Sequence, residues 1–198
     1  MEKYREATAT RHMEQMNDLA TTQSKPETLC LGASYFERLL WCEDLKYVRK
    51  ILDPLQPAIL AKGGDKAEHL NWRINHLMDN LPPTLDNLKR IVICIGLNNW
   101  PRTEGLVAKI QYGIDRLRSH WPNIDIYVEP IPITPSNVKQ SEAVKQFNST
   151  LLTIRNAIIL DDALTWAGIN TADHFIDEVH LNAEGYRIWL NNLTAQLL

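Results

Sequence analysis

The sequence lacks most features that would mark it as disulfide-rich, membrane-spanning or nucleic-acid-binding. Its three cysteines are too few and too odd in number for a disulfide framework, and two of them, Cys30 and Cys94, lie in apolar runs. No apolar run approaches the roughly 18 residues of a membrane span, and the charged start of the chain has no signal-peptide core. The net charge of −3, with both signs interspersed, offers no basic face to phosphates. We therefore expect a cytoplasmic protein with free thiols and no nucleic-acid partner, secreted only if the sequence is an excised domain.

The composition that is present is that of a globular protein. Of 198 residues, 44% are apolar and 23% charged, enough to bury a core, and this length predicts one domain. Four residues near the start, Ala9, Met13, Met16 and Ala20, recur at helical spacing. This pattern predicts that residues 1–24 form a helix packed on the outside of a domain of residues 25–198.

Short apolar runs alternate along the chain with segments of helical character. The apolar runs lie at Thr28–Leu31, Ala58–Ala61, Ile91–Ile95, Ile126–Val128 and Ala157–Leu160. Continuous runs this short are typical of strands buried on both faces. The helical segments between and after them lie at Glu37–Lys50, Ala67–Asn80, Glu104–Ser119, Val138–Arg155 and Ala183–Leu197. The alternation predicts an α/β fold, a three-layer α/β/α sandwich around a five-stranded parallel sheet of the flavodoxin-like kind.

Three successive runs end in glycine next to a polar side chain. The three segments are Gly32-Ala33-Ser34, Gly63-Gly64-Asp65 and Gly96-Leu97-Asn98-Asn99. In open α/β sheets ligands bind outside the carboxyl ends of the strands, so these segments are the first candidates for a site.

Each segment also has a purely structural interpretation. Ser34 and Glu37 match a capping box, Asp65 could cap the next helix, and asparagines are common turn residues. In the catalytic interpretation Ser34 is a nucleophile on a sharp strand-to-helix turn, while Gly64 and Asn98 donate hydrogen bonds to an anionic oxygen. A phosphate loop is disfavoured because the Walker pattern is absent from the sequence.

The last candidate segment, Asp177-Glu178-Val179-His180, directly precedes the final helical stretch, for which Asn182 is a plausible cap. It could be no more than a solvated acidic loop. However, a carboxylate three residues before an imidazole can hold its Nδ1–H and leave Nε2 free to accept a proton from a serine. The order serine, aspartate, histidine along the chain is also that of α/β hydrolases.

Together these segments resemble the sequence blocks of the SGNH (GDSL-type) hydrolases, and among them the intracellular platelet-activating-factor acetylhydrolases. The resemblance extends from about Glu27 to the C-terminus. It implies a serine esterase that hydrolyses short-chain, chiefly acetyl, esters of a lipid or carbohydrate through an acyl-enzyme, without a metal or organic cofactor. The implied catalytic residues are Ser34, Asp177 and His180, and the implied oxyanion hole comprises Ser34, Gly64 and Asn98. Trp100 and Asn99 are candidates for the substrate pocket, and the family makes a homodimer an expectation.

One residue departs from the family pattern. Where the family's first block reads Gly-Asp-Ser, this chain has Ala33 in place of the aspartate. The change removes no proton-transfer group, but it removes a carboxylate that could shape the nucleophile turn. The alternative hypothesis is therefore a catalytically weak or inactive SGNH-like module that binds a partner or RNA.

Overall fold

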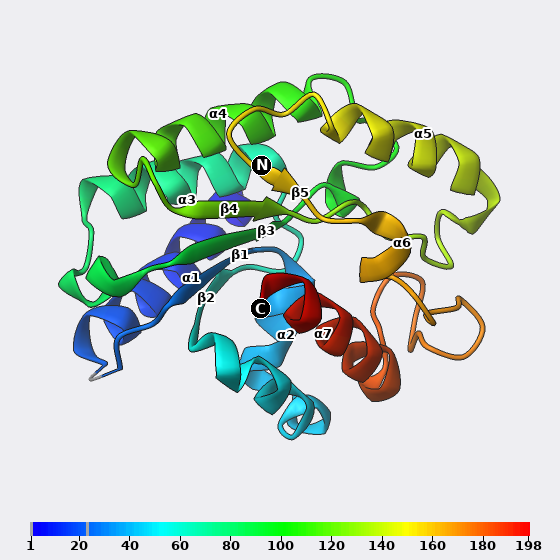
Figure 1. Ribbon diagram of the computed structural model, residues 1–198, viewed down its shortest axis with the longest axis horizontal. Coiled ribbons are helices and arrows are strands. Elements are labelled where there is room, and N and C mark those ends of the chain that lie inside the picture. Colours follow the sequence, from blue (N-terminus) through cyan, green and yellow to red (C-terminus); the bar gives the residue numbers. More distant parts are fainter. Residues whose placement is uncertain (1, 23) are drawn as a thin grey trace.

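The computed structural model describes residues 2–22 and 24–198, and these fold around one parallel sheet (Figure 1). The strands are β1 (Thr28–Gly32), β2 (Pro57–Ala61), β3 (Arg90–Cys94), β4 (Asp125–Val128) and β5 (Ile158–Ile159). All pair in parallel, in the spatial order β2-β1-β3-β4-β5. The predicted five-stranded parallel sheet and α/β class are confirmed.

Helices cover both faces of this sheet, so two apolar clusters form the core (Figure 1). One face is covered by α1 (Glu2–Thr21), α3 (Ala67–Asp79), α4 (Leu106–His120) and α5 (Ser141–Leu151). The other face is covered by α2 (Ser34–Trp41), the 3₁₀ helix η2 (Val48–Leu55) and α7 (Ala183–Leu197). Because both faces are buried, the strands carry nearly continuous apolar sequence rather than an alternating pattern.

The order of the strands places a crevice between β1 and β3. From β1 the chain first adds β2 on one side and then returns to add β3 on the other. The connections that leave the carboxyl ends of β1 and β3 therefore diverge to opposite faces, which is where open α/β sheets bind ligands. The segments that follow β1 and β3 carry Ser34 and Asn98.

Two predicted helices are shorter than their sequence patterns indicated. The stretch 37–50 is not one helix: α2 ends at Trp41, Cys42 adopts an extended conformation, and the 3₁₀ helices η1 (Glu43–Leu45) and η2 follow. The stretch 138–155 begins with the 3₁₀ helix η5 (Val138–Gln140), and α5 ends at Leu151. By contrast α7 spans the predicted residues, and the Asn182 side chain caps it by accepting the Gly185 N–H.

The face of α1 that packs on the domain is not the predicted apolar stripe. Of the four residues proposed for it, only Met16 is buried, while Met13 is 43% exposed. Among residues 6–21 of α1, the buried ones are Thr8, His12, Gln15, Met16 and Leu19. Three of these are polar, so apolar periodicity could not detect them. This face lies against β2 and α3, and the division of the chain into residues 1–24 and 25–198 stays a prediction.

The remaining elements are the 3₁₀ helices η3 (Pro83–Asn87) and η4 (Leu97–Asn99) and the single turn α6 (Asp162–Thr165). Cys30 and Cys94 are buried free thiols, as predicted, and Cys42 is half-buried. Across residues 2–22 and 24–198, none of the helices combines the length and apolar character needed to cross a bilayer.

Candidate active site

Ser34 is the first residue of α2 and lines a small cavity at the carboxyl ends of β1 and β3. The cavity has a volume of about 20 Å³ and is lined mainly by apolar groups. Its lining residues are Ala33, Ser34, Tyr35, Cys94, Ile95, Gly96, Leu97, Asn98, Pro130 and Pro132. The predicted capping box is wrong, because Ala33 is the N-cap and the Glu37 carboxylate lies elsewhere. The hydroxyl of Ser34 is thus not engaged as a helix cap.

The Gly64 loop, defined as residues 62–66, lies directly against the nucleophile turn. The Gly63 N–H donates to Glu37 Oε2 at 2.7 Å, and a β-carbon built on Gly63 would lie 3.6 Å from Ser34 Cβ. Gly64 itself has φ +80°, a left-handed conformation that glycine adopts without steric cost. The loop that carries the predicted backbone donor is therefore packed against the predicted nucleophile.

Asp65 does not cap α3, which corrects the structural interpretation of that segment. Lys66 is the N-cap, and its backbone N–H donates to His69 Nδ1 at 3.1 Å. The Asp65 carboxylate is instead buried and paired with Arg73 Nε at 2.8 Å. The carboxylate therefore faces Arg73 and not the first turn of the helix.

Asn98 lies in η4, in the segment that follows β3, and lines the same cavity as Ser34. Its Nδ2 atom donates to the Asp65 carbonyl oxygen at 3.0 Å. A side-chain amide has two N–H groups. One therefore orients Asn98 against the Gly64 loop, and the second can be offered to an oxyanion in the cavity.

Asp177 and His180 lie together in the loop before α7. His180 Nδ1 and Asp177 Oδ2 are 2.7 Å apart, while Asp177 Oδ1 accepts the backbone N–H groups of Val179 at 2.8 Å and His180 at 2.7 Å. Burial opposes ionisation of Asp177, but these hydrogen bonds outweigh it, so the pKa of the carboxyl lies below its ordinary value. An ionised carboxylate on Nδ1 fixes the tautomer that leaves Nε2 as the proton acceptor.

A hydrogen bond connects this loop to the nucleophile turn. The hydroxyl of Tyr35, the residue after Ser34, donates to the carbonyl oxygen of Val179 at 2.8 Å. Val179 immediately precedes His180. The structure thus brings together the Ser34 turn, the Gly64 loop and Asn98, and it ties the Asp177–His180 loop to that turn through Tyr35.

The two residues proposed for the substrate pocket do not line this cavity. Trp100 packs against Phe147, and its Nε1–H donates to Gln140 Oε1 at 2.9 Å. Asn99 is buried, and its Oδ1 accepts the Ala67 N–H at the start of α3. A substrate contact by either residue stays a prediction.

Sequence reasoning missed one ionisable group close to the cavity. Glu129 is 1% exposed, follows β4 directly, and its Oε1 accepts the Trp189 indole N–H at 2.8 Å. Burial raises the pKa of Glu129 to about 7, against the effect of hydrogen bonds from Cys94 and Trp189. A carboxylate directly after an apolar run was the available signal. Within the described part of the chain, no three His, Cys, Asp or Glu side chains are grouped as metal ligands.

Comparison with known proteins identifies similar sequences and folds. The model of the GDSL-like lipase/acylhydrolase family matches residues 30–188. The platelet-activating factor acetylhydrolase IB subunit alpha2 of Rattus norvegicus is 26% identical over 177 residues, covering 82% of this chain and 72% of that protein.

Two solved structures show the same fold at low identity. A GDSL-like lipase from Bacteroides thetaiotaomicron superposes with a TM-score of 0.69 at 12% identity, covering 94% of this chain and 98% of that one. A carbohydrate esterase family 3 protein from Talaromyces cellulolyticus has a TM-score of 0.60 at 14% identity, with 86% and 95% covered.

Proposed function

The chain belongs to the GDSL-like lipase/acylhydrolase family, and on this basis we propose that it is a serine esterase that hydrolyses short-chain, chiefly acetyl, esters of a lipid or carbohydrate. In this proposal Ser34 is the nucleophile, His180 the general base and Asp177 its orienting carboxylate. The backbone N–H groups of Ser34 and Gly64 and the amide of Asn98 form the oxyanion hole.

The chemistry is acyl transfer in two steps. Ser34 Oγ attacks the ester carbonyl carbon while its proton passes to His180 Nε2, and the carbonyl oxygen becomes an oxyanion held by the three donors. When the tetrahedral intermediate collapses, the bond to the alcohol breaks and His180 returns the proton to the leaving oxygen. Water then attacks the acyl-enzyme by the same route and releases the carboxylic acid and free Ser34.

The observation that carries this proposal is the 2.7 Å contact between Asp177 Oδ2 and His180 Nδ1. It lies in a loop whose Val179 carbonyl is bonded to the residue after Ser34. A carboxylate that holds Nδ1 of an imidazole, in a loop bonded to the residue after Ser34, supports the catalytic interpretation over a solvated surface loop. The pair supplies the base and orienter of a triad, and the turn supplies the nucleophile.

The size and lining of the cavity support a short acyl group. About 20 Å³ holds little more than one water molecule, similar to the methyl of an acetyl group. The names of two similar proteins, an acetylhydrolase and a carbohydrate esterase, fit an acyl ester of a lipid or sugar alcohol. The substrate is then a small molecule and the reaction needs no cofactor. The homodimer that the family resemblance implies and the cytoplasmic location expected from the sequence remain part of the proposal.

The test compares wild type with Ser34→Ala on p-nitrophenyl acetate, butyrate and octanoate, together with labelling by a fluorophosphonate. Wild type should cleave acetate best and be labelled, and Ser34→Ala should lose both properties. Ser119→Ala is the matched control, because Ser119 is exposed on α4 and its hydroxyl bonds only within that helix. Hydrolysis that survives Ser34→Ala would end the proposal.

A second candidate, a weak or inactive binding module, rests on Ala33. Ala33 lines the cavity beside Ser34 and packs against the apolar core, so this position carries a methyl group where the family pattern has a carboxylate. Folded wild-type protein that is neither labelled nor active would favour this candidate. A fluorophosphonate adduct on Ser34 would exclude the inactive form, since adduct formation needs an activated hydroxyl, and efficient turnover of p-nitrophenyl acetate would exclude the weak form.

A further inference from the structure

The Gly64 loop is useful for catalysis only if its backbone N–H is held where the oxyanion forms. Hydrogen-bond donors stabilise a transition state when they are fixed before the reaction, since a donor that must reorient gives back part of its contribution. Gly64 lies in an exposed turn, in a left-handed conformation. Within the loop, the Asp65 N–H donates to the Lys62 carbonyl oxygen at 3.1 Å. This bond shapes the turn but does not attach it to the rest of the fold. Contacts from other elements are therefore needed to fix the position of the loop.

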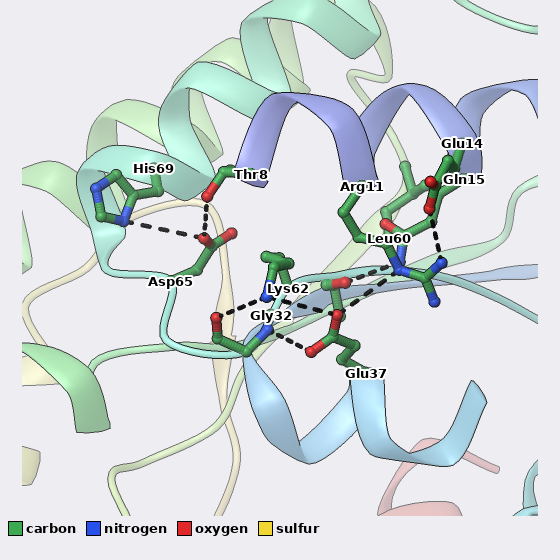
Figure 2. Close-up of polar contacts among 12 residues, drawn as sticks. Thr8, Arg11, Glu14, Gln15, Gly32, Glu37, Leu60, Lys62, Asp65 and His69 are labelled. Atoms are coloured by element: carbon green, nitrogen blue, oxygen red, sulfur yellow. Dashed lines mark hydrogen bonds and ion pairs between the residues drawn. The ribbon is translucent and has the colours of Figure 1, made fainter. Parts of the chain in front are cut away.

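Asp65 provides the main contact. Its side chain is fully buried, and its carboxylate accepts a hydrogen bond from Thr8 Oγ1 at 3.1 Å (Figure 2). The carboxylate also pairs with Arg73 Nε at 2.8 Å. Its carbonyl oxygen accepts the Asn98 amide at 3.0 Å. A buried carboxylate is tolerated only when paired and hydrogen-bonded. Asp65 is thus next to Gly64 in the chain and bonded to Asn98, two of the three predicted oxyanion donors.

Arg73 extends this contact to the nucleophile turn. Its guanidinium is 1% exposed and donates to the Gly32 carbonyl oxygen at 2.6 Å and to the Leu60 carbonyl oxygen at 2.7 Å. Gly32 ends β1, two residues before Ser34. One planar group therefore fixes the ends of β1 and β2 relative to Asp65, and a guanidinium can do this because it directs several N–H donors in a rigid geometry.

A further contact to Asp65 comes from α1, which lies outside residues 30–188 that match the family model. Besides Thr8, Gln15 Nε2 donates to the Ala61 carbonyl oxygen at 2.8 Å. Arg11 Nε lies 3.6 Å from Glu37 Oε1 (Figure 2). Glu37 in turn holds the Gly63 N–H. These contacts explain why the buried face of α1 is polar: it bonds to β2 and to the nucleophile helix as well as to the loop.

We propose that Asp65 is a positioning residue for the oxyanion donors Gly64 and Asn98, and that α1, through Thr8, completes the hydrogen bonds that hold Asp65 in place. The proposal rests on the proposed esterase function. Neither residue touches substrate; each acts on the transition state by fixing the Gly64 loop. The effect is therefore on kcat and not on KM, because the ester binds before the oxyanion exists.

The test uses the isosteric variant Thr8→Val, which removes the hydroxyl but keeps the shape and leaves Arg73 paired with Asp65. We expect kcat for p-nitrophenyl acetate, per labelled active site, to fall about fivefold to tenfold with KM within about twofold. Thr8→Ser, which retains a hydroxyl, should restore most of kcat. Thr10→Val makes the same change on the exposed face of the same helix and should match wild type.

A second measurement follows the loop itself. Amide hydrogen exchange at residues 63–65 should be faster in Thr8→Val than in wild type, with exchange in β3 unchanged. A lowered melting temperature with unchanged kcat and unchanged exchange would show a merely structural role and overturn the inference. If wild type is active and Ser34→Ala is not, but Thr8→Val equals wild type, only this inference falls. If wild type is neither active nor labelled, the proposed function falls and this inference falls with it.

Discussion

The hydroxyl of Tyr35 donates a hydrogen bond of 2.8 Å to the carbonyl oxygen of Val179, and so joins the residue after Ser34 to the residue before His180. The two residues are 144 positions apart in the sequence. Tyr35 is nearly fully buried and its ring lies against Trp189. The bond therefore fixes the loop of the proposed base to the helix of the proposed nucleophile.

Removing this hydroxyl should slow catalysis without creating a cavity in the core, because the aromatic ring remains. We expect Tyr35→Phe to lower kcat about fivefold, the value of one net hydrogen bond, with little change in KM. Steady-state kinetics on p-nitrophenyl acetate measures both constants. Tyr112→Phe, a change on the exposed surface of α4, is the control, and equal kinetics of the two variants would contradict the role of the Tyr35 bond.

The amide of Asn98 should contribute more to kcat than the Tyr35 hydroxyl does, because it is proposed to contact the oxyanion. Asn98→Ala should lower kcat on the order of 10²–10³-fold. Asn98→Asp should be no better, since a carboxylate has no N–H to donate and repels the developing charge. Asn75→Ala on α3 provides the control. A loss below threefold in both Asn98 variants would remove this residue from the proposed oxyanion hole.

Asp177→Asn tests the orienting role of the carboxylate. The asparagine carbonyl can still accept the backbone N–H groups of Val179 and His180, so the loop should remain folded. Its amide cannot accept from His180 Nδ1, and without that acceptor the imidazole loses its tautomer and orientation. We expect kcat to fall on the order of 10³–10⁴-fold. The neighbouring exposed variant Glu178→Gln should keep wild-type kcat, and comparable losses in the two variants would refute the assignment.

We predict that burial of Glu129 makes the folding stability of the protein depend on pH. Because burial raises its pKa in the folded protein from the ordinary value of 4.5 to about 7, the folded state binds this proton more tightly than the unfolded state. The destabilisation of the folded state by buried Glu129 is therefore absent below pH 4.5. It grows as the pH rises to about 7 and is constant at higher pH. It amounts to about 3 kcal/mol at 1.36 kcal/mol per pKa unit.

The variant Glu129→Gln should remove this dependence, because a glutamine carbonyl can still accept the Trp189 N–H but cannot ionise. The measurement is urea unfolding at pH 5 and at pH 8. The unfolding free energy of the variant minus that of wild type should be about 2–3 kcal/mol larger at pH 8 than at pH 5. The exposed Glu142→Gln should show no such rise. A difference that is independent of pH would mean that Glu129 does not titrate in this range.

The sheet was predictable from sequence because its strands are buried on both faces. Each therefore appears as a short continuous apolar run, and Ile91–Ile95 and Ala58–Ala61 correspond to β3 and β2 within a residue or two. The end of α2 at Trp41 had no such signal, since neither glycine nor proline follows it directly. The sequence pattern therefore predicts a helix that continues to Lys50, whereas α2 ends at Trp41.

The part of the candidate site formed by residues close together in the sequence was predictable. Asp177 and His180 are three residues apart, and their contact follows from that spacing. The roles of Thr8 and Asp65 were not predictable, because their bond joins elements 57 residues apart and both side chains look like surface or capping residues in the sequence. One signal was available: Arg73 lies on the apolar face of α3 with Leu70 and Leu77, where a buried charge requires a partner.

The polar underside of α1 bears on how this protein is produced in the laboratory. A recombinant product cut at the boundaries that the family model suggests would begin near Cys30 and lack the donors that Thr8 and Gln15 supply to Asp65 and Ala61. Such a product would keep every residue with a proposed chemical role. It would nevertheless lose the hydrogen bonds from α1 that help to fix those residues in position. On the proposed role of Thr8, the family boundaries leave out residues that position the oxyanion donors, and assays are best run on protein that retains its first twenty-odd amino acids.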